Sequence, residues 1–345
     1  MAKPADYWQA RDLSSAAYNG LINADVMQQI WDISSIPLPL MDAIGSDSAD
    51  NPYTEWTTDK LSAPTIGGWV IDGADSDQNN SAAGNRMGNH CGILTREVQV
   101  SERAQSVDTI GRADELAYQV MMRQRELRRN VEANLLGIQG SQADDGATLP
   151  GRPAGLAAMI LKLAGSAGTG GAFSNGNWTA WTPGAYRALT ETMVRDAAQQ
   201  AWESGSDPSL LMSVPSATRK LSEYMFSSSA RIATLARETK GEDTAATALG
   251  SVNVFITDFG VTLEFVPNRL QQTYTAPTAT QACSVFILDP AYLRVSYLQD
   301  FHTDQLAKTG LTDKKLMSVD FTLKVLNQDA HRVIPDINPL AAVTA

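Results

Sequence analysis

Apolar residues recur at intervals of three and four over residues 106–136, which is the clearest hydrophobic pattern in the chain. That spacing places them on one stripe of an α-helix, with charged residues on the other faces. Gly137 and Gly140 follow the pattern, and glycine favours the backbone conformation that ends helices. We therefore predict a helix of about 40 to 45 Å, at a rise of about 1.5 Å per residue. Its stripe consists of Ala113, Leu116, Ala117, Val120, Leu127, Val131 and Leu135.

Two segments before this helix have the alternation and composition of β-strands, residues 54–58 and residues 92–100. Between them, residues 72–81 are too polar to be buried. Two strands with a long polar stretch between them predict an extended β-hairpin that projects from the body. Because an isolated hairpin is marginally stable in water, we expect this one to lie on another surface.

The first 50 residues have the pattern of an arm rather than of a domain. A short run of apolar residues at helical spacing ends at Trp31, and residues 36–40 then contain two prolines. Each proline fixes its own φ angle and keeps the preceding residue out of the helical region, so we predict an extended path there. Such a segment needs a partner surface, either in this chain or on a neighbour.

Helices and strands alternate from residue 183, which predicts a compact α/β domain. Two further strands follow, and Pro335 and Pro339 are expected to end regular structure. The glycine-rich run at 165–171 lacks the lysine and hydroxyl residue of a phosphate-binding loop, so we interpret it as a flexible loop. The predicted helices cover 185–204 and begin again at Pro215, and the predicted strands are 210–214, 252–256, 261–266, 283–288, 294–298 and 318–326.

The chain of 345 residues has the composition of a globular protein, with 43% hydrophobic and 19% charged residues. The net charge of -11 disfavours general binding to nucleic acids, because the chain repels phosphate at long range. The same charge is no objection for a protein that only lies near nucleic acid. Cys91 and Cys283 are far apart, which fits two buried thiols in a reducing cytosol.

A search for chemistry-bearing motifs predicts no catalytic, cofactor or metal site. His90, His302 and His331 each lack a second ligand at metal-binding spacing. Residues 258–260 read Asp-Phe-Gly, but the companion motifs of kinases are absent, so we interpret the triplet as a turn. No apolar run is long enough to cross a bilayer, and the first ten residues do not resemble a signal peptide.

Several short motifs occur in a characteristic order, among them Asp-Pro-Ala-Tyr-Leu-Arg-Val at 289–295. With the order arm, hairpin, long helix, α/β domain and returning strand, they give the chain a resemblance to the major capsid proteins of tailed bacteriophages. Those proteins have the Hong Kong 97-type fold, and the likeness covers most of the chain. The motifs lie at 98–104, 254–260, 267–269, 289–295, 306–310, 322–327 and 334–337.

The resemblance implies an α+β, Hong Kong 97-like capsid fold with five parts. Residues 1–50 would be the N-terminal arm and residues 51–105 the E-loop β-hairpin. Residues 106–160 would form the peripheral domain with its long spine helix, and residues 161–290 the axial domain. Residues 291–345 would return to the peripheral domain and form the C-terminal tail.

On this interpretation, arms and hairpins become stable by lying across neighbouring subunits. The basic cluster on the long helix could be a nucleic-acid patch, but Glu126 and Glu132 are interleaved with it, which favours a solvated face or a subunit contact. We expect the lumen surface to be neutral or negative, with these arginines in pairs or contacts. The predicted intersubunit contacts are Trp31, Trp56, Trp69, Arg123, Arg125, Glu126, Arg128, Arg129 and Glu132.

Some capsids of this fold cross-link an E-loop lysine to an asparagine of a neighbour. Lys60 is the sole lysine between Lys3 and Lys162, so it is the E-loop candidate, with Asn327 or Asn338 as acceptors. The interpretation that we favour for Lys60 is an ordinary surface lysine.

The predicted function is that of a non-enzymatic shell subunit of an icosahedral or prolate phage head. The expected partners are copies of the chain in hexamers and pentamers, a portal protein at one vertex, and scaffold and decoration proteins, with no membrane. The shell would enclose double-stranded DNA without sequence-specific binding, in a virion assembled in the bacterial cytoplasm.

Two other functions remain open on the sequence. An encapsulin-like compartment shell shares the fold but encloses an enzyme, and its genomic neighbours would be a peroxidase or ferritin-like gene rather than terminase and portal genes. A soluble α/β enzyme with its site in residues 161–290 is disfavoured by the motif search.

Overall fold

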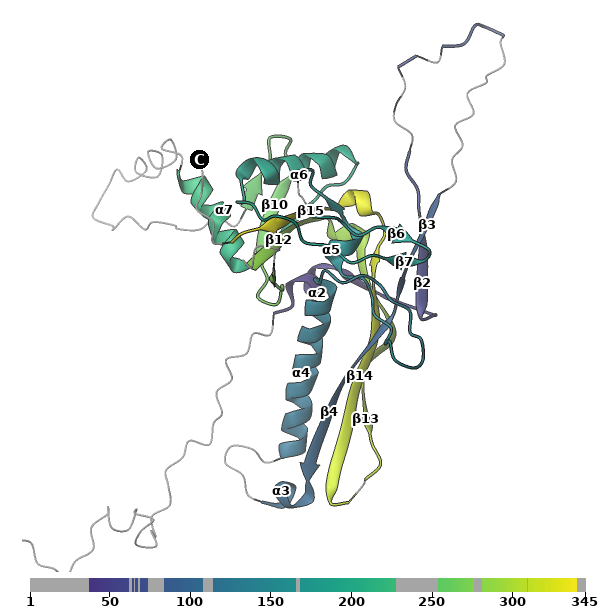
Figure 1. The fold of residues 1–345 in the computed structure, drawn as a ribbon, viewed down its shortest axis with the longest axis vertical. Coiled ribbons are helices and arrows are strands. Elements are labelled where there is room, and N and C mark those ends of the chain that lie inside the picture. The colour runs from purple at the N-terminus through teal and green to yellow at the C-terminus, as the bar shows by residue number, and fades with distance from the viewer. Residues whose placement is uncertain are drawn as a thin grey trace, which may run out of the picture.

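The computed structural model describes residues 37–61, 64, 66–67, 69–73, 84–107, 114–165, 168–227, 254–275, 281–308 and 310–339. The predicted helical pattern that ends at Trp31 lies outside these residues. Figure 1 shows a rounded upper body, a long lower extension built on one helix and several strands, and a hairpin that projects from the body.

A seven-stranded sheet forms the upper body, in the order β5-β15-β12-β8-β10-β9, with β11 paired to β12. Helices α6 and α7 cover one of its faces, and their alanines pack there on Leu211, Leu263 and Ile287. The predicted α/β domain is confirmed, including the hairpin of β9 and β10 and its turn at Gly260, which has a φ of 87°. The elements are α6 (Glu191–Glu203), α7 (Pro215–Ser227), β5 (Leu161–Lys162), β8 (Leu210–Ser213), β9 (Val254–Ile256), β10 (Thr262–Pro267), β11 (Tyr274–Thr275), β12 (Gln281–Leu288) and β15 (Arg332–Ile337).

Helix α6 begins later than predicted. Thr190 accepts a hydrogen bond from the Met193 backbone N–H at 3.4 Å, so the helix starts at Glu191 and not at residue 185. Trp202 of this helix is about half exposed and lies against Phe259, with 5.4 Å between the ring centroids.

The lower extension is a four-stranded sheet in the order β1-β13-β14-β4, with helix α4 lying along it. Leu127, Val131 and Leu135 of α4 join the same buried cluster as residues of β4 and β14. The predicted strands of the C-terminal part are confirmed and are longer than expected. The elements are β1 (Gly45–Ser48), β4 (Gly92–Ser101), β13 (Leu293–Gln305), β14 (Thr312–Val325) and α4 (Glu115–Leu135).

The long helix is shorter than predicted. The Asp114 carboxylate accepts a hydrogen bond from the Ala117 backbone N–H at 2.9 Å and caps α4. A separate short helix, α3 (Glu102–Ser106), precedes it. The 21 residues of α4 span about 32 Å instead of the expected 40 to 45 Å.

The hairpin is real, but its second strand is not the one predicted. Strand β2 (Tyr53–Thr58) pairs with β3 (Asn85–His90), whereas β4, the expected partner, pairs with β14. Strand β3 reads Asn-Arg-Met-Gly-Asn-His, which carries no apolar alternation. Its strand character therefore comes from pairing and not from the local sequence.

The prediction that Pro335 ends regular structure is wrong, because β15 continues through Pro335 to Ile337 with all of its residues buried. Cys283 pairs with Ile337 and Val285 with Ile334, so Pro335 and Asp336 together lie opposite one residue of β12. This is a β-bulge, and Asp336 has a φ of 59°. Proline is tolerated at a bulge because a backbone N–H is not required there.

The prediction for residues 36–40 is also wrong in part. Pro39 opens a short helix, α2 (Pro39–Ala43), instead of continuing an extended path. Proline suits the first helical position, where its missing N–H would have had no partner. The remaining elements are α5 (Leu156–Met159), β6 (Phe173–Ser174), β7 (Asn177–Trp178) and the 3-10 turns η2 (Pro290–Tyr292) and η3 (Gln328–Ala330).

Candidate functional site

The base of the β2–β3 hairpin is fixed to the body of its own chain. Trp178 donates a hydrogen bond from Nε1 to the Gly88 carbonyl at 2.9 Å. Asn89 is fully buried and donates to the Leu323 carbonyl at 2.9 Å, while its own Oδ1 accepts from the Ala154 backbone N–H at 3.0 Å. Because these bonds join the hairpin to β7, β14 and the segment before α5, its direction is set within the single chain.

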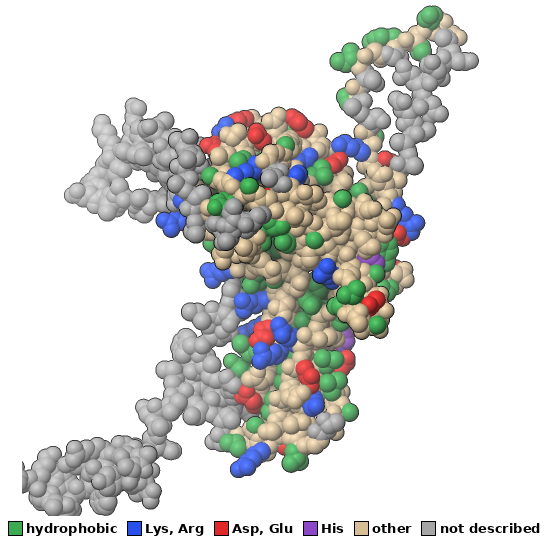
Figure 2. Space-filling model, viewed as in Figure 1, with side chains coloured by type: hydrophobic (Ala, Val, Ile, Leu, Met, Phe, Trp, Pro, Cys, Tyr) green, Lys and Arg blue, Asp and Glu red, His purple; other side chains and the backbone are tan. Residues whose placement is uncertain are grey.

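The segment beyond this base, which we call the hairpin extension (the described residues of 59–73), exposes large apolar side chains. Leu61 is 95% exposed, Trp69 96% and Ile71 83%, and Ile66 is fully exposed. Figure 2 shows hydrophobic side chains at the far end of this projection. Exposed apolar side chains are costly in water, and a surface that gathers them is a candidate for contact with another molecule. Trp69 therefore lies where its predicted intersubunit contact requires, and the contact itself stays a prediction.

Trp56 of β2 lies nearer the body. Its ring is partly buried against the core cluster of its own chain. Much of its burial therefore comes from this chain, and a contact of Trp56 with a neighbour stays a prediction.

The arginines of α4 are mostly engaged within the chain. Arg123 pairs with Glu126 at 2.5 Å, and the guanidinium of Arg128 lies 5.4 Å from the centroid of the Phe301 ring. The side chains of Arg125 and Arg129 are half-buried. These pairs agree with the expectation that the basic side chains are engaged, and their contacts with other subunits remain untested.

Glu132 does not lie on a solvated face, so that part of the prediction is wrong, and its contact with another subunit stays a prediction. Its carboxylate is fully buried and accepts hydrogen bonds from the backbone N–H groups of Leu40 at 2.8 Å and Met41 at 2.9 Å, and from Asn268 Nδ2 at 2.7 Å. Burial raises the pKa of Glu132 above its usual value, while these bonds act in the opposite sense. Glu132 therefore joins the end of the arm, the long helix and the residue that follows β10.

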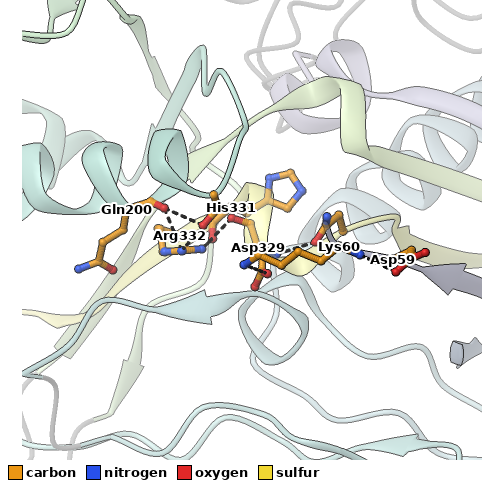
Figure 3. Close-up of polar contacts among 8 residues, drawn as sticks. Asp59, Lys60, Gln200, Asp329, His331 and Arg332 are labelled. Carbon is orange, nitrogen blue, oxygen red and sulfur yellow. Dashed lines mark hydrogen bonds and ion pairs between the residues drawn. The ribbon is translucent and has the colours of Figure 1, made fainter. Parts of the chain in front are cut away.

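Lys60, the cross-link candidate, has an ionic partner in its own chain. Its Nζ lies 2.9 Å from Asp329 Oδ2 in η3, and Figure 3 shows the two side chains facing each other. The Asn327 side chain accepts a hydrogen bond from the Asp329 backbone N–H at 3.0 Å. Arg332 continues the network to the Gln200 carbonyl at 3.1 Å. This geometry agrees with an ordinary surface lysine.

In the described part of the chain, the two cysteines and His302 lie in surroundings that do not activate them for catalysis. Burial raises the pKa of Cys91 to about 11 and that of Cys283 to about 12, so both stay thiols at neutral pH. Ser318 Oγ and Asp304 Oδ2 both approach Nε2 of His302, at 3.0 and 3.4 Å, whereas a catalytic triad uses both ring nitrogens. Among these residues, His, Cys, Asp and Glu form no group of three that could hold a metal ion.

None of the helices in the described ranges combines the length and the apolar character needed to span a bilayer.

Solved structures similar to the chain are shell proteins. The capsid of cyanophage A-1(L) gives a TM-score of 0.59 over 95% of this chain and 99% of that one, at 13% identity. The capsid of a native GTA particle gives 0.58 over 93% and 97%, at 11% identity. The holo-SrpI encapsulin complex from Synechococcus elongatus gives 0.52 over 96% and 98%, at 12% identity. At these identities the likeness shows the fold alone, and it confirms the predicted Hong Kong 97-like architecture.

Comparison of sequences gives a more specific result. No curated protein matches the chain. The family model described as SU10 major capsid protein matches residues 12–338, which is nearly the whole sequence. The chain therefore belongs to the SU10 major capsid protein family and is a structural subunit of a phage capsid shell.

Proposed function

We propose that copies of this chain form hexamers and pentamers that close into a phage head around double-stranded DNA, with a portal protein at one vertex. Family membership establishes the coarser role, a subunit that assembles with itself into the capsid of a virion. Assembly in the bacterial cytoplasm, and the use of scaffold or decoration proteins, belong to the same proposal.

The observation that carries the proposal is the hairpin extension. Its base is fixed by buried hydrogen bonds, while Leu61, Ile66 and Trp69 stand in solvent. Apolar side chains gain free energy when a second molecule removes them from water, at about 25 cal/mol per Å² of apolar surface. Many copies with this feature supply the modest, repeated contacts that hold a shell together.

We assign the parts of the fold as the sequence predicted them. Residues 1–50 serve as the arm and residues 51–105 as the E-loop, in which β2 and β3 form the hairpin. The peripheral domain combines residues 106–160 with residues 291–345, and residues 161–290 form the axial domain. The pairing of β13 with β14, and the packing of α4 in the same buried cluster, support a single peripheral unit made from distant parts of the chain. Strand β4, from residues 51–105, pairs with β14 and extends the same sheet.

DNA is enclosed without sequence-specific contacts in this proposal. The net charge of -11 opposes adhesion to phosphate, and two arginines of α4 are engaged inside the chain, Arg123 with Glu126 and Arg128 with Phe301. A compartment shell of the encapsulin type has the same fold, and terminase and portal genes beside this one would distinguish the phage head from it.

Expression of the full chain followed by electron microscopy and sedimentation tests the proposal. We expect closed shells from the wild type and free subunits from Trp69→Ser, because the variant loses an exposed contact and no internal one. Ile256→Ser, a matched change at a side chain that is 69% exposed on β9, should still assemble. A wild-type chain that stays monomeric, or a Trp69→Ser variant that assembles normally, would overturn the proposal.

A further inference from the structure

We propose that Trp69 of one subunit inserts into a pocket beside the hairpin base of the next subunit. This inference rests on the proposed function and names the contact that the hairpin extension makes. The occupant is a second copy of this chain.

The pocket is open to solvent and has a volume of about 200 Å³. Its apolar walls come from Ile93, Leu94, Pro153 and Phe321, and Ile93 is 64% exposed although it is a large apolar residue. A cavity of about 150 Å³ with apolar walls holds benzene, so this pocket has room for an indole ring. A second pocket, lined by Tyr274 and Phe286, has about 50 Å³ and is too small.

Arg152, a charged residue of the pocket lining, can contact both an indole ring and an acidic residue that follows it in the chain. Arg152 lines the pocket, and an arginine beside an aromatic ring gives a cation–π contact. Asp72 lies three residues after Trp69 and is the natural ionic partner for Arg152 once the ring is seated. Tryptophan is also one of the residue types enriched among the side chains that contribute most to binding at protein interfaces.

Trp69 lies in the hairpin extension, whereas the pocket lies beside the hairpin base. Gly92, which lines the pocket, follows the last residue of β3 by two positions, whereas Trp69 belongs to the hairpin extension and is 96% exposed in its own chain. Each subunit therefore offers one anchor and one pocket on different surfaces. A head-to-tail contact of this kind generates closed rings, which is the arrangement that hexamers and pentamers require.

A disulfide cross-link tests the contact in assembled shells. In the double variant Ile71→Cys with Ile93→Cys, mild oxidation should give covalent ladders that end at five and six subunits. Each single variant, and the matched pair Ile71→Cys with Ile256→Cys, should give monomers in a denaturing gel. If shells form and the first pair gives only monomers, the docking site is wrong while the proposed function stands. If the wild-type chain itself forms no shells, the proposed function fails.

A charge exchange gives an independent test that leaves Trp69 in place. Asp72→Arg and Arg152→Asp should each lower the yield of shells about tenfold, and the double variant should recover most of it, as expected for residues in direct contact. Additive losses in the double variant would overturn the proposed pairing.

Discussion

The backbone N–H of Leu40 donates a hydrogen bond of 2.8 Å to the carboxylate of Glu132, across 92 positions of the chain. The same carboxylate receives the N–H of Met41 and the amide of Asn268. One buried side chain thus holds the start of α2 and the residue that follows β10 against the long helix. In a shell subunit, this bond fixes the point from which the arm departs.

Replacing Glu132 with glutamine should destabilise the subunit by about 1 to 3 kcal/mol. The glutamine amide presents an NH₂ group to one of the three donors, which leaves a buried donor without an acceptor. Urea unfolding of the unassembled subunit would measure the loss of free energy.

Glu126→Gln is the matched control on the same helix. Its partner Arg123 is partly exposed, so the change should cost less than about 1 kcal/mol. Equal losses for the two variants would show that the buried carboxylate has no special role.

The sequence pattern predicted the elements in which burial of one face leaves a regular spacing of apolar side chains. The stripe of Leu127, Val131 and Leu135 identified α4, because burial of one helix face produces that spacing. Strand β3 was missed because its pairing with β2 and the hydrogen bonds of the buried, polar Asn89 hold it in place, and neither gives an apolar alternation in the sequence. The pairing of β4 with β14 joins Gly92 to Phe321, a separation that no local pattern reports.

The candidate contacts were predicted less well for a related reason. Glu132 was placed on a solvated face because it is charged, although it lies three residues before Leu135 and next to Val131 on the buried stripe. That position was a signal that sequence reasoning could have used. The three donors to its carboxylate come from distant segments, and the sequence alone does not bring them together.

Acid should weaken the fold through His331. Burial lowers the pKa of this histidine from 6.5 to about 4. The unfolded chain takes up a proton at this histidine near pH 6.5, whereas the folded chain does not. The contribution of the neutral histidine to the free energy of unfolding is therefore fully present above pH 6.5 and is lost as the pH falls toward 4. The free-energy advantage of the wild type over His331→Asn should therefore shrink by about 3 kcal/mol between pH 7 and pH 4. A constant difference across that range would contradict the burial of a neutral imidazole.

Loosening the hairpin base should increase local opening without unfolding the body. Trp178→Phe keeps an aromatic ring but removes the donor to the Gly88 carbonyl, at a cost of about 1 kcal/mol. Hydrogen exchange read by mass spectrometry should be faster in peptides that cover β2 and β3. Trp202→Phe, at a half-exposed ring on α6, should leave that exchange unchanged.

Boiling assembled shells in detergent should release monomers, because Lys60 is expected to act as a surface lysine. Its ion pair with Asp329 joins side chains that are 63% and 24% exposed, so water screens the attraction. Lys60→Met and Asp329→Asn should each change the unfolding free energy by less than about 1 kcal/mol, and the two changes together should cost no more than the larger one. Covalent ladders that appear in the wild type and disappear in Lys60→Met would show instead that this lysine forms a cross-link to a neighbour, and the pair with Asp329 would then be the state before that reaction.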